Sequence, residues 1–145
     1  MKYLSSAPSI SDSMEAAWSL VTKIKEVIVQ FVDSDNDGIR TLALKFMEMI
    51  VLIQTHRGPE SAAKENDFCL DDVPLGLKLA RPRKLEEDAR RVFDEMIKYH
   101  GSAHISSANL MTCMGSIANI AKLRPEFMSK VSEKTQFFSF RYFIY

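Results

Sequence analysis

Hydrophobic residues recur at helical spacing in four stretches of the chain. In the first stretch, about residues 13–32, seven apolar residues fall on one stripe. Asp12, with Glu15 three residues later, resembles a capping box at the start of this stretch. The pattern predicts a helix, and its stripe consists of Met14, Ala17, Trp18, Val21, Ile24, Ile28 and Phe31.

A polar run at residues 33–38 interrupts the pattern, and a second helix is expected over about residues 38–55. The apolar residues of this helix cover two faces. A helix that is apolar on two faces is buried between neighbours, so helices are expected on both sides of it. One face is Ile39, Leu42, Ala43, Phe46, Ile50 and Ile53, and the other is Leu44, Met47 and Val51.

Helical periodicity disappears from residue 56 to residue 82, where Pro59, Pro74 and Pro82 predict a long loop. Two further helices are expected over about residues 83–100 and 106–123, and Pro125 suits the first turn of another. The helix over residues 106–123 is nearly uncharged. We expect burial of its Met111, Met114, Ile117, Ala118 and Ala121.

Two helices in each unit of roughly 40 residues match the repeat length of HEAT and armadillo proteins. The sequence therefore predicts an all-α solenoid of antiparallel helix pairs over residues 1–135. Residues 136–145 leave this pattern and form a divergent aromatic tail. Such a β-prone segment is an aggregation hazard.

Composition excludes several classes of function. Among 145 residues, 19 are Lys or Arg and 19 are Asp or Glu, so the formal charge is zero. This balance argues against nucleic-acid binding through a broad basic face. The two cysteines, Cys69 and Cys113, do not suggest a disulfide scaffold. The longest charge-free stretch, residues 105–121, is shorter than a membrane helix needs, so no membrane contact is expected.

The polar run at residues 33–38 resembles the first half of an EF-hand loop. Asp33, Asp35 and Asp37 occupy the first, third and fifth ligand positions, and Gly38 occupies the sixth. Position 12 needs a bidentate Glu, but the residue there is Leu44. We interpret the run as a turn between two helices, and weak calcium binding through it is the alternative.

A local basic cluster and the absence of catalytic motifs complete the picture. Lys78, Arg81, Arg83 and Lys84 form a solvated loop end, and a nuclear-import signal or an RNA contact of a helical repeat are the alternatives. Cys113 lies among apolar residues and reads as a buried structural thiol. No phosphate-binding loop or nucleophile elbow is present and no carboxylate pair lies in an evident pocket, so we expect no enzyme activity, cofactor or metal.

Two stretches of the chain are similar to a known family. The first runs from Asp33 to Thr41 and continues through Ala43, Lys45 and Phe46. The second comprises residues 105–110, 115–121 and 124–129. With Trp18, these residues resemble a truncated form of the symplekin N-terminal domain over about residues 10–131.

The resemblance implies a non-catalytic HEAT-like scaffold in the nucleus. Members of the family organise the cleavage and polyadenylation factors of messenger RNA precursors. Their N-terminal domain holds a phosphatase that acts on the C-terminal domain of RNA polymerase II, through a lysine on the helix after the acidic turn. Lys45 occupies the matching place, and we expect Met49 and Leu52, one and two turns further along, to extend the contact.

Two further expectations come from the repeat architecture. In HEAT repeats an Asp before the second helix and an Arg just inside it commonly form a ladder between repeats, and Asp35 or Asp37 followed by Arg40 resembles that signature. The family's solenoid begins several helices earlier. We therefore expect the first helix pair to expose apolar surface that an earlier repeat covers.

Overall fold

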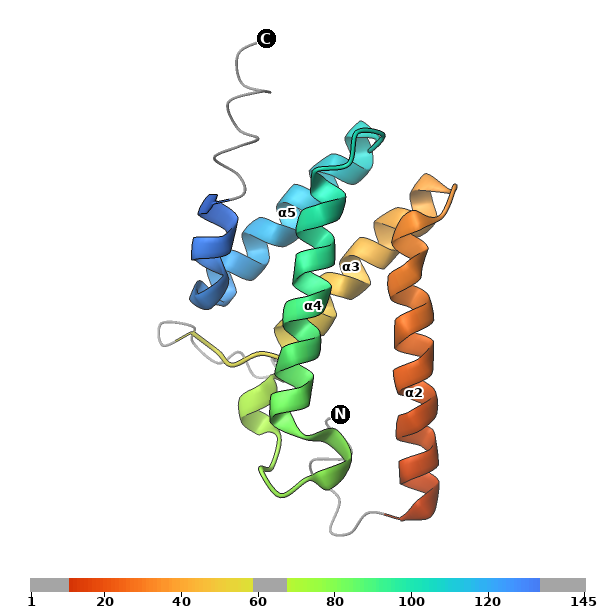
Figure 1. The fold of residues 1–145 in the computed structure, drawn as a ribbon, viewed down its shortest axis with the longest axis vertical. Helices are drawn as coiled ribbons and strands as arrows, with labels where there is room; N and C mark the ends of the chain where they lie inside the picture. The colour runs from red at the N-terminus through yellow and green to blue at the C-terminus, as the bar shows by residue number, and fades with distance from the viewer. Residues whose placement is uncertain (1–10, 59–67, 134–145) are drawn as a thin grey trace.

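A computed structural model describes residues 11–58 and 68–133, and the regular structure in these ranges is helical throughout. The main helices are α2 (Asp12–Gln30), α3 (Asp37–Ile53), α4 (Pro82–His100) and α5 (Ser107–Leu123). Each lies within about two residues of its predicted position, and a turn at Pro125–Phe127 (η4) is followed by helical residues 128–133. The predicted all-α fold is confirmed (Figure 1).

Local capping explains where the helices begin. The side chains of Ser11, Asn36 and Ser106 each accept backbone N–H groups from the first turn of α2, α3 and α5, respectively. The expectation that Asp12 caps the first helix is wrong, because Ser11 takes that role one residue earlier. Pro82 is the first residue of α4, where its missing N–H costs nothing.

The helices form two HEAT-like pairs, α2 with α3 and α4 with α5 (Figure 1). Helix α3 packs against all three other helices, as its two apolar faces predict. The rings of Phe93 and Phe127, both core residues, lie 4.5 Å apart between centroids. The fully buried apolar members of the core include Leu44, Met47, Val51, Val92, Phe93, Met96, Cys113 and Ile120.

The sequence did not predict which apolar residues reach solvent. On α3, Leu42 is 71% exposed although it belongs to a predicted apolar face. On α5, Ile117 is buried as expected, but Met111 is 70% exposed and Met114 is also exposed. The expectation for these two methionines, and for Ala118, is wrong because α5 packs on α3 and α4 through its opposite side.

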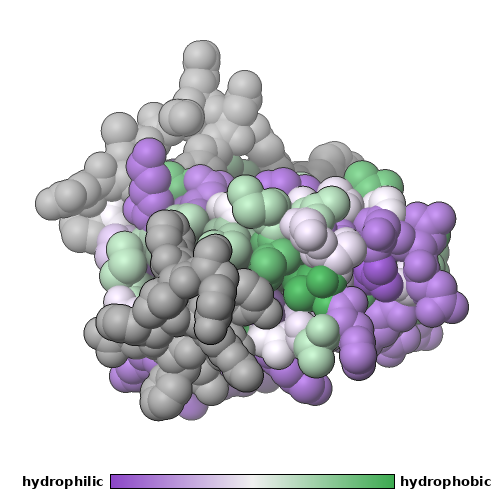
Figure 2. Space-filling view, turned by 90° about the horizontal axis from the view of Figure 1, so that it is seen from above, coloured by the Kyte–Doolittle hydropathy of each residue, from purple (hydrophilic) through white to green (hydrophobic). Residues whose placement is uncertain are grey.

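Helix α2 exposes four large hydrophobic side chains, Leu20, Val21, Ile24 and Val27. Only Val29 is buried in this helix, together with Val32 in the short turn η1 (Phe31–Asp33) that follows. Val21 and Ile24, which belong to the predicted stripe, are exposed. This agrees with the expected apolar surface on the first pair. Seen from above, hydrophobic side chains reach the surface beside a hydrophilic region (Figure 2).

The segment predicted as a loop contains two 3-10 turns, η2 (Leu70–Asp72) and η3 (Lys78–Ala80). They contribute to a second hydrophobic cluster, which the sequence did not predict because no periodicity marks it. Its buried members are Leu70, Val73, Leu77, Ala80 and Leu85, with Met14, Trp18, Phe68 and Leu79 packed around them.

Hydrogen bonds of residues 70 and 71 connect the segment between α3 and α4 to the end of α3. Leu70 N donates to Thr55 O at 3.2 Å, and the Asp71 carboxylate bonds His56 Nδ1 and, at 3.0 Å, Arg57 N. Burial raises the pKa of Asp71, but hydrogen bonds from His56, the Arg57 backbone and Cys69 outweigh it and lower the pKa to about 2. The predicted tail at residues 136–145 lies outside the described residues.

Candidate partner-binding surface

The outward face of α3 presents a lysine between apolar side chains. Leu42, Lys45 and Met49 follow at intervals of three and four residues, so they lie on one side of the helix. The Lys45 side chain is 56% exposed, and Met49 is 47% exposed. Leu52 is half-buried against the core at the edge of this face. The three residues predicted to bind a partner thus lie close together on α3, next to the exposed Leu42.

Beneath Lys45 lies a carboxylate that the sequence analysis did not single out. Lys45 Nζ donates to Glu48 Oε2 at 2.8 Å. From α5, Ser116 Oγ donates to Glu48 Oε2 and Asn119 Nδ2 donates to Glu48 Oε1, each at 2.6 Å. Glu48 is buried. One carboxylate therefore receives a hydrogen bond from the exposed lysine and two from the next helix pair.

These contacts keep Glu48 ionised. Burial by itself raises the pKa of the Glu48 carboxyl, because it disfavours the charged form. Hydrogen bonds from Lys45, Ser116 and Asn119 more than compensate, so the pKa lies below its ordinary value. Near neutral pH, the outward face therefore carries a fixed ion pair rather than an isolated ammonium.

The acidic turn before α3 is tied to α5 through Asp37. Arg40 pairs with the Asp37 carboxylate and donates to Ser34 O at 2.7 Å. Asn109 Nδ2 donates to Asp37 Oδ1 at 2.9 Å. The hydrogen bond from Arg40 is the main reason that the pKa of Asp37 is lowered. These contacts are consistent with a ladder role for Asp37 and Arg40, which we propose.

The other parts of the acidic turn do not build a metal site among the described residues. Asn36 caps α3 through Gly38 N and Ile39 N. Asp35 forms no hydrogen bond with the residues described, but its charge helps to raise the pKa of Arg40, so we keep it with Asp37 as a proposed ladder residue. Within residues 11–58 and 68–133, no group of three or more His, Cys, Asp or Glu side chains is arranged to hold a metal ion. No observation in this part of the chain favours the calcium alternative.

Arg124 joins α3 and α5 at their other end. It is 1% exposed and is the largest fully buried side chain among the described residues. Its Nη2 donates to Leu52 O at 2.6 Å, its Nη1 to Leu123 O at 2.9 Å and its Nε to Thr55 Oγ1 at 3.0 Å. Glu48 in the middle and Arg124 at the end thus hold α5 against the helix that carries Lys45.

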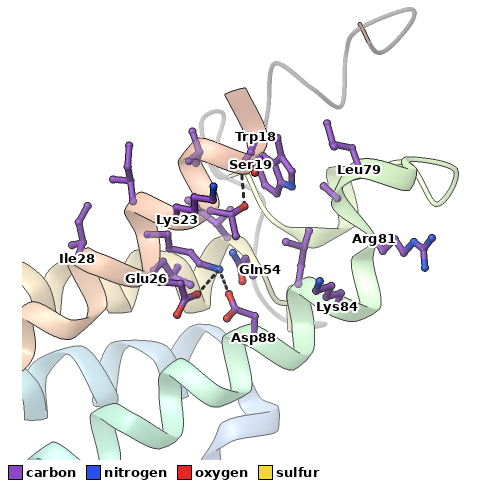
Figure 3. Close-up of a pocket in the computed structure, with 18 of the residues that line it drawn as sticks. Trp18, Ser19, Lys23, Glu26, Ile28, Gln54, Leu79, Arg81, Lys84 and Asp88 are labelled. Atoms are coloured by element: carbon purple, nitrogen blue, oxygen red, sulfur yellow. Dashed lines mark hydrogen bonds and ion pairs between the residues drawn. The ribbon is translucent and has the colours of Figure 1, made fainter. Parts of the chain in front are cut away.

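A groove of about 1080 Å³ lies between α2, α3 and α4 (Figure 3). Trp18 on α2 and Leu79 in η3 flank one end, and Lys25 pairs with Asp88 across it. Met49 lines the groove as well as the outward face. The other apolar lining residues of α2 and α3 are Val21, Ile24, Ile28, Phe46, Ile50 and Ile53.

The basic cluster next to this groove is only partly neutralised. Arg83 Nε lies 3.3 Å from Glu87 Oε1, whereas Lys78, Arg81 and Lys84 make no ion pair with the described residues. Lys78 and Arg81 lie before and at the N-cap of α4, so they do not form a stripe along a helix. The RNA alternative stays a prediction, and no feature of the fold adds to it.

The polar residues that join α3 to α5 are only weakly marked in the sequence as buried hydrogen-bonding residues. Glu48 is a charged residue between the buried Met47 and Ile50, and Asn109, Ser116 and Asn119 are polar residues in a nearly uncharged helix. A polar residue in an apolar pattern indicates a buried hydrogen bond, but it does not indicate the partner. The partners lie 68 to 72 residues away in the chain.

Comparison with known protein families gives one match that covers nearly all of the chain. The family model described as Symplekin/PTA1 N-terminal matches residues 1–140. That range contains every residue of the outward face and of the Glu48 network. No helix in the described part of the chain is long and apolar enough to cross a membrane.

Proposed function

Because the chain belongs to the Symplekin/PTA1 N-terminal family, we propose that its outward α3 face binds a phosphatase that acts on the C-terminal domain of RNA polymerase II. The family points to a scaffold role in messenger RNA 3′-end processing, which is a nuclear function. The proposal adds a specific partner, the phosphatase, and a specific contact, Lys45. Other cleavage and polyadenylation factors are further proposed partners.

The observation that carries the proposal is the setting of Lys45. Its ammonium is exposed, yet it is held by a buried carboxylate and flanked by the exposed apolar side chains of Leu42 and Met49. A few residues of a protein interface carry most of the binding energy, neighbouring contacts exclude water from them, and Met is enriched at interfaces. Binding a partner through this face involves no reaction catalysed by this chain, which fits a non-catalytic scaffold.

The test is a Lys45→Ala variant of the full 145-residue chain. We expect at least about a tenfold loss of affinity for the purified phosphatase, since truncating a hot-spot residue costs about 2 kcal/mol or more and about 1.4 kcal/mol corresponds to a factor of ten. Lys98→Ala is the matched control, because Lys98 is a surface lysine on α4 and is 82% exposed. Calorimetry or interferometry gives the affinity, and circular dichroism checks the helix content.

If Lys45→Ala and the unmodified chain bound the phosphatase equally well, with unchanged helix content, Lys45 would not be a phosphatase contact. A loss that appears equally in Lys98→Ala would show a nonspecific effect of surface charge and would refute the proposed face as well.

A further inference from the structure

An exposed lysine is a poorly organised contact unless something fixes it. The Lys side chain is a flexible four-carbon stem with a strongly hydrated ammonium, and ordering it on binding reduces affinity. The surface pair of Lys98 with Glu95 is an example of a lysine that its partner holds only weakly. Its N–O distance is 3.9 Å, and the two side chains are 82% and 47% exposed.

The pair of Lys45 with Glu48 has the same spacing of three residues but a different environment. Its N–O distance is 2.8 Å, and the Glu48 side chain is 11% exposed. The Glu48 carboxylate is itself held on both oxygens by Ser116 and Asn119 of α5. Charge-assisted hydrogen bonds from three directions leave the carboxylate little freedom, so the ammonium that bonds to it is restrained too.

We propose that Glu48 is a positioning residue for the partner contact. It holds the Lys45 ammonium in its binding geometry and, through Ser116 and Asn119, makes that geometry depend on the docking of α5 against α3. This inference rests on the proposed function of Lys45. It adds that the recognition element spans two repeat units, because the donors on α5 lie 68 and 71 residues after Glu48.

A purely structural role for Glu48 makes a different prediction. If Glu48 only joins α3 to α5, then removing its charge weakens the fold whether or not Lys45 is present. If Glu48 positions Lys45, then removing its charge weakens partner binding only while Lys45 is present. A double-mutant cycle separates the two roles, since coupled residues give non-additive effects and independent residues give additive ones.

The experiment measures phosphatase affinity for Lys45→Ala, Glu48→Gln and the double variant, all in the full chain. Gln is close to Glu in shape and keeps an oxygen that accepts from α5, while the charge is lost. We expect Glu48→Gln to weaken binding about three- to tenfold and to add nothing further once Lys45 is Ala. Glu95→Gln is the matched control, and we expect its affinity to stay within about twofold of the unmodified chain.

A second readout does not depend on the partner. In a chain labelled with ¹³C-lysine, the two ε-methylene protons of an immobilised lysine differ in NMR chemical shift. The Lys45 signal is identified by its absence from Lys45→Ala. We expect inequivalent ε-protons for Lys45 in the unmodified chain and in Glu95→Gln, and equivalent ones in Glu48→Gln.

The outcomes are distinguishable. Unchanged binding in Lys45→Ala removes the contact itself, and with it both the proposed function and this inference. Three other outcomes overturn the inference alone, provided that Lys45→Ala weakens binding. These are additive losses in the double variant, full affinity of Glu48→Gln, and Lys45 ε-protons that stay inequivalent in Glu48→Gln. Should Glu48→Gln lose helix content, Asn119→Ala replaces it, because this variant removes only the donor to Oε1 and should show the same non-additivity with Lys45→Ala.

Discussion

Replacing Arg124 by Met tests how much the guanidinium group between α3 and α5 contributes to the free energy of unfolding. No carboxylate pairs with Arg124 among the described residues, although the side chain is fully buried. Its acceptors include Leu52 O and Leu123 O, which belong to the last turns of α3 and α5. Helix C-termini leave carbonyls without intrahelical donors and carry partial negative charge. The two helix ends therefore replace the missing carboxylate.

The magnitude follows from what Arg124→Met leaves behind. Met fills much of the same space, so the cavity is small. The part-buried carbonyls of Leu52 and Leu123 and the buried hydroxyl oxygen of Thr55 lose a donor, and a fully buried acceptor without a partner costs about 1–3 kcal/mol. Removing a buried charge recovers part of its desolvation cost. The expected net loss is about 2–4 kcal/mol, out of the roughly 5–15 kcal/mol that a domain has.

The assay is urea unfolding of the 145-residue chain, followed by circular dichroism at the helix band. Arg83→Met is the control, because the Arg83 side chain is 91% exposed and makes one surface ion pair, so its loss should stay below about 0.5 kcal/mol. If Arg124→Met lost less than about 1 kcal/mol, or no more than the control, the claim that helix ends hold this guanidinium would be wrong.

Two further predictions concern titratable groups. The pKa of Asp71 is about 2 in the folded chain and ordinarily 3.8, so its contribution is complete above about pH 4 and is lost as the pH falls towards 2. Urea midpoints between pH 5 and pH 2.5 should therefore fall more for the unmodified chain than for Asp71→Asn, and parallel curves would contradict this. Burial raises the pKa of the Cys113 thiol to about 12, so a thiol reagent should modify Cys113 only at the rate of unfolding, and rapid labelling of the native chain would disprove its burial.

Much of the fold could be predicted because its signals are local. The helix positions follow from apolar periodicity, which is visible within a few turns of the chain. The helix starts were predicted less well: Asp12 was expected where Ser11 caps α2, and Pro82 was placed in the loop although it begins α4. The all-α class and the pairing of successive helices follow in turn. The central place of α3 was also predictable, because an apolar pattern on two faces requires neighbours on both sides.

The candidate site was predictable only in part. The resemblance singled out Lys45, and helical spacing placed Met49 with it on one face, as the structure has them. Glu48 and its two donors on α5 were missed, because these hydrogen bonds join residues 68 and 71 positions apart. The assignment of Lys45 to a phosphatase contact and the ladder role of Asp37 and Arg40 stay predictions until they are measured.

Tertiary packing alone decided which apolar and polar residues are buried. Periodicity shows that a helix has an apolar face, but that face is wider than the neighbours that cover it, so Met111 is exposed while Ile117 on the same helix is buried. The converse holds for charge. Arg and Glu side chains are rarely fully buried unless they are paired. Arg124 and Glu48 are buried because the docking of α5 on α3 supplies their hydrogen-bond partners.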